Sequence, residues 1–366
     1  MSIRVNNPRI GANFWVGIAL LTIWCVQGCT PFLRSNPPPA PISSPTDLIP
    51  ITDWYSVYFT QPGVPNAETL RGGPDAALAE AIREANLGVD IAMDTLDLWS
   101  IRDALIDANQ RGVRVRIVVE SDNLDEPEIQ DLIQAGIEVL GDRREGMMHN
   151  KFAILDRQEV WTGSMNFTLN GAYRSDNNLI RVRSEQLAEN YLVEFEEMFV
   201  DDAFGPGSPA DTPYANLQID STPVEVYFSP DDGVQQQLVD LIGRARQSIY
   251  FLAYSFTSDE LAEAILSRAA AGVTVAGVLD EGQALGNQGG EFQHFLDSGL
   301  KVRLDGNPKS MHHKVLIIDD RIVVTGSYNF SQNAETRNDE NTLVIVSPEI
   351  AALYKAEFER VFRLAK

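Results

Sequence analysis

The chain has 366 residues, with 29 Lys and Arg against 52 Asp and Glu, and its formal net charge is −23. This length accommodates about two domains with proper hydrophobic cores. So acidic a chain is poorly suited to sequence-independent binding of nucleic acid, or to docking on anionic lipid through a broad basic face, although a locally positive cleft is compatible with it. Both cysteines, Cys25 and Cys29, lie near the N-terminus, so the rest of the chain has neither a disulfide nor a thiol nucleophile.

Residues 1–29 have the composition of an export signal. Arg4 and Arg9 precede an apolar run that is short for a membrane span. The run leads to Cys29 in a pattern similar to a bacterial lipobox, so we expect cleavage and lipidation at Cys29, with an uncleaved signal anchor or a secreted form as the alternatives. The Pro-rich segment 30–52 is typical of a semi-rigid tether. We therefore expect an exported protein that is anchored to a membrane.

The remainder divides into two similar halves, 53–203 and 223–366, joined by a linker over 204–222 that is rich in Pro, Gly, Asp and Ser. Each half opens with a short strand, at 57–60 or 226–229, and continues as alternating helices and strands. This alternation predicts an α/β fold with a mixed sheet in each half and helices on both faces. Two similar halves of one chain are expected to pack about an approximate two-fold axis, so a monomer would contain an internal pseudo-dimer.

One pattern, His-x-Lys-x4-Asp-x6-Gly-Ser-x-Asn, occurs once in each half. Six fixed positions repeated at a constant interval are hard to explain by chance. We therefore expect a duplicated unit whose two copies meet at one shared site. The residues are His149, Lys151, Asp156, Gly163, Ser164 and Asn166 in the first half, and His312, Lys314, Asp319, Gly326, Ser327 and Asn329 in the second.

The motif residues have the chemistry needed to hold and attack a phosphate. His149 and Lys151 are two positions apart at the start of an apolar run, so on extended backbone they share one face, and the same holds for His312 and Lys314. Gly permits close backbone approach, while Ser hydroxyls and Asn amides can donate to anionic oxygens. Two imidazoles, two ammonium groups and these neutral donors suit in-line displacement at phosphorus without a metal or cofactor.

A metal site is the sharper alternative for the same residues. Asp156 and Asp319 each follow the motif His by an odd number of positions, which tends to place them on the opposite face of the strand. We therefore predict structural roles for both, with turn amides or Arg as partners, and no metal. His313 faces away from the site and His294 lies in a helix, so neither is expected to take part.

The doubled motif resembles that of the phospholipase D superfamily, which includes bacterial phospholipases D, cardiolipin synthases and Nuc-like endonucleases. The resemblance extends over roughly residues 55–364 and implies a covalent phosphohistidine intermediate formed without a cofactor. It makes one of the two motif histidines the nucleophile and the other the general acid. By position it assigns phosphate binding to Lys151, Lys314, Asn166 and Asn329, and the two motif serines, Ser164 and Ser327, are expected to join them.

Family members often carry an acid some eleven residues after the motif Asn. The second half has Glu340 there, whereas the first half has Asn177. A carboxylate beside an imidazole favours the protonated, acidic ring, and an amide orients the ring without that effect. If each partner serves the His of its own half, His149 is the nucleophile and His312 the acid. If the partners cross between halves, this rule reverses the roles.

Other charged residues lie near the motifs. Arg174 and Arg337 occupy equivalent loops after the two copies, where phosphate binding and simple solvation are both compatible with the sequence. Arg143, Arg144 and Lys309 lie just upstream of the motif strands, where they could line the mouth of the cleft, but we favour solvated loops for them. We interpret Glu194, Glu196 and Glu197 as one solvated helix face.

The function most consistent with these features is a phospholipase D that hydrolyses phospholipid head-group esters at a membrane. A secreted endonuclease would use the same residues but should have a basic groove. A phosphatidyltransferase similar to cardiolipin synthase would transfer to an alcohol instead of water. A catalytically silent binding protein is the least favoured alternative, because every motif His, Lys, Ser and Asn is present.

Overall fold

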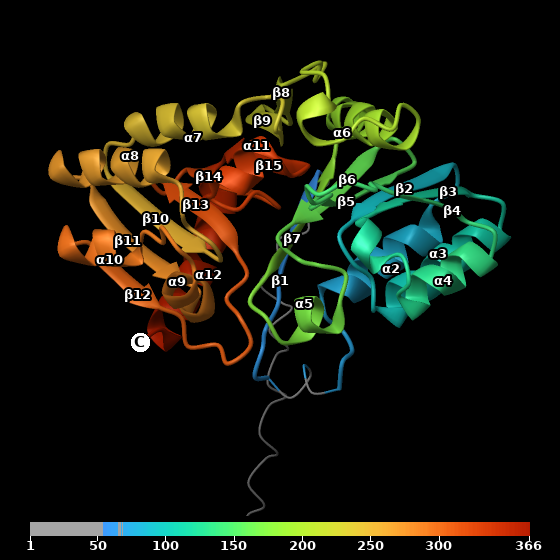
Figure 1. Ribbon diagram of the computed structural model, residues 1–366, viewed down its shortest axis with the longest axis horizontal. Coiled ribbons are helices and arrows are strands. Elements are labelled where there is room, and N and C mark those ends of the chain that lie inside the picture. Colours follow the sequence, from blue (N-terminus) through green and yellow to red (C-terminus); the bar gives the residue numbers. More distant parts are fainter. Residues whose placement is uncertain (1–53, 65–66, 68) are drawn as a thin grey trace, which may run out of the picture. The chain divides into compact units, whose positions relative to one another are not determined.

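The computed structural model describes residues 54–64, 67 and 69–366 (Figure 1). The described residues belong to one compact unit, Leu48–Lys366. The expected export signal, its Cys29 and the expected tether lie outside the described residues. Within the described part of the chain, no helix is both long enough and apolar enough to cross a membrane.

The first half is built on a seven-stranded mixed sheet in the order β1-β7-β6-β5-β2-β3-β4. The pairs β2–β3 and β3–β4 are parallel, and the other neighbours are antiparallel. The strands are β1 (Tyr55–Phe59), β2 (Gly88–Met93), β3 (Arg114–Val119), β4 (Glu138–Gly141), β5 (Lys151–Leu155), β6 (Glu159–Gly163) and β7 (Asn178–Arg183).

Helices cover both faces of this sheet. On the outer face, Leu78, Ile101 and Ile129 bring three helices into one apolar core, whereas Leu187 packs on the inner face. The helices are α2 (Pro74–Glu84), α3 (Trp99–Gln110), the short η2 (Ser121–Asn123), α4 (Pro127–Gln134), α5 (Leu169–Tyr173) and α6 (Glu185–Phe199).

The second half repeats this plan on an eight-stranded sheet in the order β12-β11-β10-β13-β14-β15-β9-β8. Its strands are β8 (Asn216–Ile219), β9 (Thr222–Ser229), β10 (Ser248–Ala253), β11 (Thr274–Leu279), β12 (Lys301–Leu304), β13 (Lys314–Ile318), β14 (Ile322–Gly326) and β15 (Glu340–Val346). Its helices are α7 (Val234–Gly243), α8 (Asp259–Ala270), α9 (Glu281–Gly286), α10 (Phe292–Asp297), α11 (Gln332–Thr336) and α12 (Pro348–Leu364), and the short η3 (Gly205–Gly207) precedes them in the segment between the halves.

The segment between the halves is partly structured. Residues 204–222 contain η3 and β8, and β8 pairs with β9 as the edge strand of the second sheet. The end of this segment is therefore part of the second half.

A core shared by both halves holds them together. Along β5, Phe152 and Ile154 point into this shared core, while Ala153 and Leu155 point into the outer core, as the two-residue period of a strand requires. Residues of α6 and α12 complete the shared core from opposite halves. The predicted duplicated α/β fold with helices on both sheet faces is thus confirmed.

Candidate active site

Reciprocal backbone contacts bring the two motif copies together. Met148 forms a parallel bridge with Asp339, and Asp176 forms the equivalent bridge with Met311. As a result the backbone N–H of His149 donates to Asp339 O at 3.0 Å, and that of His312 donates to Asp176 O at 2.9 Å. Each motif histidine is therefore held by the loop that follows the motif of the other half.

The two lysines lie under the histidines, at the first positions of β5 and β13. Lys151 Nζ donates to His149 O at 2.7 Å, and Lys314 Nζ donates to His312 O at 2.9 Å. Both side chains are almost fully buried. Burial lowers the pKa of Lys151, and burial together with the charge of Lys151 holds the pKa of Lys314 well below its usual value. A bound phosphate would place a compensating negative charge beside these two ammonium groups.

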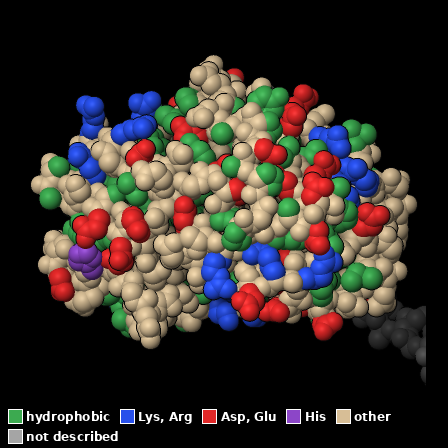
Figure 2. Space-filling view, turned by 45° about the horizontal axis from the view of Figure 1, so that its top comes forward, with side chains coloured by type: hydrophobic (Ala, Val, Ile, Leu, Met, Phe, Trp, Pro, Cys, Tyr) green, Lys and Arg blue, Asp and Glu red, His purple; other side chains and the backbone are tan. Residues whose placement is uncertain are grey.

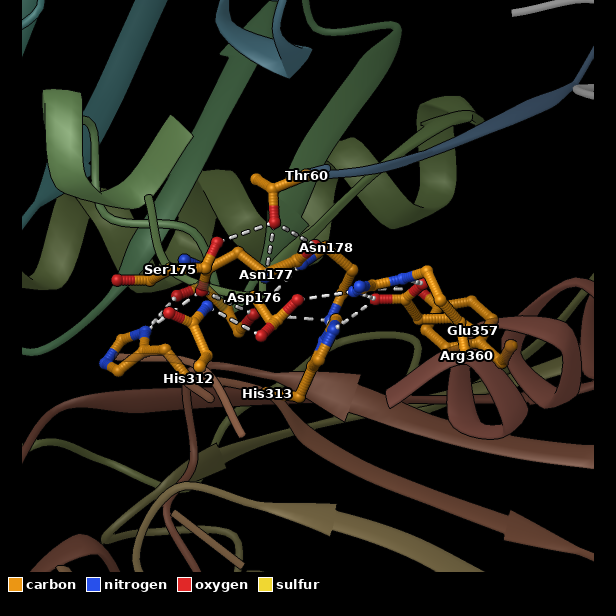
Figure 3. Close-up of polar contacts among 12 residues, drawn as sticks. Thr60, Ser175, Asp176, Asn177, Asn178, His312, His313, Glu357 and Arg360 are labelled. Atoms are coloured by element: carbon orange, nitrogen blue, oxygen red, sulfur yellow. Dashed lines mark hydrogen bonds and ion pairs between the residues drawn. The ribbon is translucent and has the colours of Figure 1, made fainter. Parts of the chain in front are cut away.

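The histidine partners cross between the halves. His149 Nδ1 lies 2.7 Å from Glu340 Oε2. His312 Nδ1 lies 3.0 Å from Asn177 Oδ1 and 3.1 Å from Ser164 O (Figure 3). The pairing within each half, on which the sequence-based assignment of roles relied, is therefore wrong. The crossing follows from the two bridges, which place the loop after each motif against the His of the other half.

These contacts also determine which ring nitrogen can react. An ionised carboxylate and a carbonyl oxygen only accept hydrogen bonds, so Nδ1 of each ring carries a proton. Asn177 is held in this orientation because its Nδ2 donates to Gly171 O at 3.0 Å. Nε2 of His149 and of His312 is therefore the atom left for attack on phosphorus or for proton transfer.

The electrostatic surroundings of the two rings differ. Burial, and then the positive charges of Lys314, Lys151 and His149, hold the pKa of His312 well below its usual value. His149 instead contacts the carboxylate of Glu340, which is completely buried. Positive charge is therefore compensated at His149 and uncompensated at His312.

The motif serines lie beneath the site, not in it. Ser164 is completely buried, and its hydroxyl donates to Asn177 Oδ1 at 2.9 Å and accepts from Asn178 N at 3.1 Å. Ser327 is also completely buried and accepts from Asn341 N at 3.0 Å. Both hydroxyls are thus engaged with the backbone and with asparagines, and a contact of the serines with phosphate stays a prediction.

The motif asparagines are better placed for that task. Asn166 and Asn329 are half-buried, and their Oδ1 atoms are buried without a hydrogen-bond partner among the described residues. A buried amide without partners is costly unless something completes its hydrogen bonds. An unpaired Oδ1 accepts only from a donor, so the expected contact with phosphate oxygens would have to come from the Nδ2 groups of the two amides.

The motif glycines allow two strands to approach closely. Gly163 has φ 148°, and a Cβ there would lie 2.4 Å from Asn178 O. Gly326 has φ 146°, and a Cβ there would lie 2.2 Å from Asn341 O. Only glycine fits both constraints.

The motif aspartates lie at the far end of the strands from the histidines. Asp156 accepts from the backbone N–H groups of residues 86–88, and Asp319 from those of residues 246–248. They thus fasten the motif strands to the turns that precede β2 and β10. Among the described residues, no group of three His, Cys, Asp or Glu side chains is arranged to hold a metal ion.

Several residues that support the site were missed by sequence reasoning. Thr162 donates to Asn341 Oδ1 at 2.6 Å and Thr325 to Asn178 Oδ1 at 2.8 Å, so a second pair of contacts crosses between halves. Glu120 accepts from Met148 N at 2.9 Å, and burial, then the nearby Asp142, raise its pKa to about 7. For Asn341 and Asn178, the sequence did carry a signal, because these asparagines repeat at equivalent positions after the two motifs.

The site is asymmetric because one pair of equivalent positions holds different residues in the two halves. Asp94 and Tyr254 each follow the strand that pairs with a motif strand, β2 or β10. The Tyr254 ring meets the His312 ring edge-on at a centroid distance of 4.5 Å, and Lys314 Nζ lies 4.7 Å from the Tyr254 centroid. A carboxylate thus borders one side of the site and an aromatic ring the other.

Charged residues interpreted from sequence as solvated are partly buried. Arg144 forms an ion pair with the buried Asp339 across the halves. Glu194 and Glu197 are buried against the segment that includes Asp231, which corrects the prediction of a solvated helix face. Packing of α6 into the shared core, not the local charge pattern, determines this burial.

Comparison with known proteins agrees with this geometry. The family described as "Cardiolipin synthase, PLD-like domain" matches residues 78–199 and 238–362, one match in each half. A phospholipase D of Rickettsia bellii is 34% identical over 141 residues, which are 38% of this chain and 70% of that protein. A mitochondrial cardiolipin hydrolase of Chlamydomonas reinhardtii is 31% identical over 130 residues, or 36% of this chain, and the match spans 58% of its length.

Among solved structures, phosphatidylserine synthase of Haemophilus influenzae shares the fold over both halves. The TM-score is 0.64, the identity is 16%, and the match covers 85% of this chain and 87% of that chain. The doubled motif, the duplicated fold and the family match in each half lead to one conclusion: this chain belongs to the phospholipase D superfamily.

Proposed function

We propose that this protein is a phosphodiesterase of the phospholipase D type that hydrolyses phospholipid head-group esters through a phosphohistidine, without a metal. The observation that carries the proposal is the pair of His-Lys-Asn sets joined at one site by crossed contacts. The names of the relatives, phospholipase D and cardiolipin hydrolase, support a lipid substrate. Export and lipidation at Cys29, expected from the sequence, belong to the same proposal and would hold the enzyme at a membrane.

Charge supports lipid over nucleic acid. The net charge of −23 opposes binding of a polyanion along an extended surface. Figure 2 shows that, on the face it draws, Lys and Arg side chains form separate small groups among acidic ones instead of a continuous belt. A single phosphodiester needs only the local charge of Lys151 and Lys314.

In the first step, His149 Nε2 attacks phosphorus, the P–O bond to the head group breaks, and His312 Nε2 gives its proton to the leaving oxygen. Lys151 and Lys314, with the amides of Asn166 and Asn329, bind the non-bridging oxygens. In the second step, neutral His312 takes a proton from water, the hydroxide attacks phosphorus, and the P–N bond breaks. The products are the free alcohol and a phosphate monoester, and both rings return to their starting states.

His149 remains the proposed nucleophile even though its partner crosses from the other half. The sequence-based rule considered only which ring is protonated at rest. Attack leaves the nucleophilic ring cationic for the lifetime of the intermediate, and two unit charges about 4 Å apart interact by about 4 kcal/mol at an effective dielectric constant of about 20. Glu340 supplies that compensation to His149, whereas His312 has only an amide and a carbonyl.

A lowered pKa suits His312 to its part in both steps. An anionic phosphodiester bound between the lysines offsets their charge and allows the ring to hold a proton. Once that proton has gone to the leaving group, the same lysines keep the ring neutral, which a general base for water must be.

The test is release of head groups from mixed phospholipid vesicles by the full chain in EDTA, with the His149→Asn variant as control. We expect release that survives EDTA, leaves a phosphate monoester on the lipid, and falls at least about a thousandfold in the variant. Loss of release in EDTA would contradict the metal-free mechanism. Cleavage of single-stranded DNA without any release from lipid would contradict the substrate class.

A further inference from the structure

A separate cavity lies beside the active site, where the C-terminal part of α12 meets loops of the first half. Its volume is about 640 Å³, within the range of about 300–1,000 Å³ typical of ligand pockets. We call it the α12 cavity. Its lining combines apolar and basic side chains, which include Tyr173, Val361 and Leu364 on one hand and Arg174, Lys309 and Arg360 on the other.

The basic residues give the α12 cavity an excess of positive charge. Arg360 is neutralised, because it pairs with Asp176 and with Glu357. Arg174 and Lys309 are exposed, and no carboxylate of the described residues forms an ion pair with either. Among the described residues, the Arg174 guanidinium donates to the amide oxygen of Asn170 at 3.2 Å, and it interacts with Asp97 electrostatically without forming an ion pair. Two exposed cations that form no ion pair among the described residues, in one cavity of a chain with net charge −23, favour an anionic ligand.

The wall of the α12 cavity is continuous with the catalytic centre. The side chain of Asp176 lines the cavity, where Arg360 and Asn307 donate to its carboxylate. The backbone of Asp176 pairs with Ser310 and His312, and the next residue holds the His312 ring (Figure 3). Only Asp176 would therefore separate a ligand in the cavity from His312, and the ligand would not occupy the phosphate site.

The equivalent place in the other half is filled by the chain itself. Asp339, the counterpart of Asp176, accepts from Gly205 N at 2.5 Å and pairs with Arg144. The guanidinium of Arg144 lies 5.9 Å from the centroid of the Phe204 ring, which is buried. In that half an apolar group beside a cation occupies the space. The open α12 cavity thus has the lining for a ligand of the same mixed character.

We infer that the α12 cavity is a binding site for an anionic amphiphile, whose phosphate or carboxylate is held by Arg174 and Lys309 and whose apolar part lies against Tyr173, Val361 and Leu364. This site is distinct from the catalytic one and does not depend on the reaction proposed above. An isolated phosphate would use only the cations and would leave the apolar wall uncovered.

Calorimetric titration of the full chain with decanoate below its micellar concentration tests this site. The probe is a carboxylate with an alkyl chain, which is neither a substrate nor a product of the proposed reaction. We expect the Arg174→Gln/Lys309→Gln double variant to bind it about tenfold more weakly, as loss of about one net charge-assisted hydrogen bond implies. Leu364→Gln should weaken binding severalfold, since it removes apolar contact alone.

Arg337→Gln is the matched control, because Arg337 occupies the loop equivalent to that of Arg174 and faces the filled side. The affinity of the Arg337→Gln variant for the probe should equal that of the wild type. Equal affinity of the double variant and the wild type, with unchanged circular dichroism, would overturn the inference. Binding of acetate, which has the same head group without the alkyl chain, as tight as that of the probe would overturn the amphiphilic class of ligand.

Discussion

At the scale of single residues, the two catalytic histidines differ in what faces their Nδ1 atoms. Glu340 faces His149 and Asn177 faces His312, each from the opposite half. In the mechanism that we propose, the carboxylate stabilises the cation that attack creates, as the aspartate of a serine protease triad does for its histidine. The amide fixes His312 without adding charge, so burial and then the surrounding lysines keep its pKa low.

Asn177→Asp tests this division of roles. A carboxylate beside His312 should raise its pKa by about one unit or more. A general acid must be protonated, so kcat falls as pH rises through its pKa, and we expect this alkaline fall to move to higher pH in the variant. If His312 were the nucleophile, the acidic limb of the profile would move instead. Asn216→Asp, which adds the same charge on the exposed edge strand β8, should leave the profile unchanged.

At the scale of elements, each motif hairpin is fastened at both ends. The aspartate after β5 or β13 accepts three backbone N–H groups, and the glycine that ends β6 or β14 lets the following strand approach. Since the motif lysines begin these strands and the histidines lie two residues before them, small displacements of the hairpin displace the side chains of the site. The motif therefore encodes a scaffold as well as chemical groups.

Gly326→Ala should destabilise the protein by about 2–3 kcal/mol, because its Cβ would meet Asn341 O in a backbone conformation that alanine rarely adopts. The measurement is equilibrium unfolding in denaturant. Gly243→Ala is the control, since a Cβ at the end of α7 would meet open space and should cost nothing. Equal midpoints for the two variants would contradict the close-approach argument.

At the scale of the whole described unit, ion pairs and buried acids lie where the halves meet. Arg144–Asp339 joins the first half to the second, and Arg360–Asp176 joins the second to the first. Behind the first of these pairs, the acids of α6 face those of the segment between the halves and of the loop after β9. Burial, then Asp211 and the aspartates 231 and 232, raise the pKa of Glu197 to about 9.

A carboxyl whose pKa is raised by folding stabilises the native state while it is protonated. The contribution of Glu197 is therefore complete at pH below about 4.5, its unfolded value, and is lost as pH rises towards about 9. Glu197→Gln replaces the carboxyl by a neutral amide. Between pH 5 and pH 8, we expect the unfolding free energy of the variant to rise relative to that of the wild type by at least about 1 kcal/mol. This is less than the free energy that corresponds to a pKa shift of one unit. A difference that does not change with pH would contradict the burial of a titrating carboxyl here.

The sequence by itself determined the duplication, the α/β class, the family and the identity of the His, Lys and Asn side chains at the site. These features depend on local periodicity and on fixed spacings, which do not depend on how the chain packs in three dimensions. The tertiary structure alone decided that Glu340 serves His149, that Ser164 lies under the site, that Glu197 is buried and that the α12 cavity is open where Phe204 fills its counterpart. Those facts depend on contacts between residues far apart in the chain, and such contacts are determined by how the two halves pack, which no spacing within one half can specify.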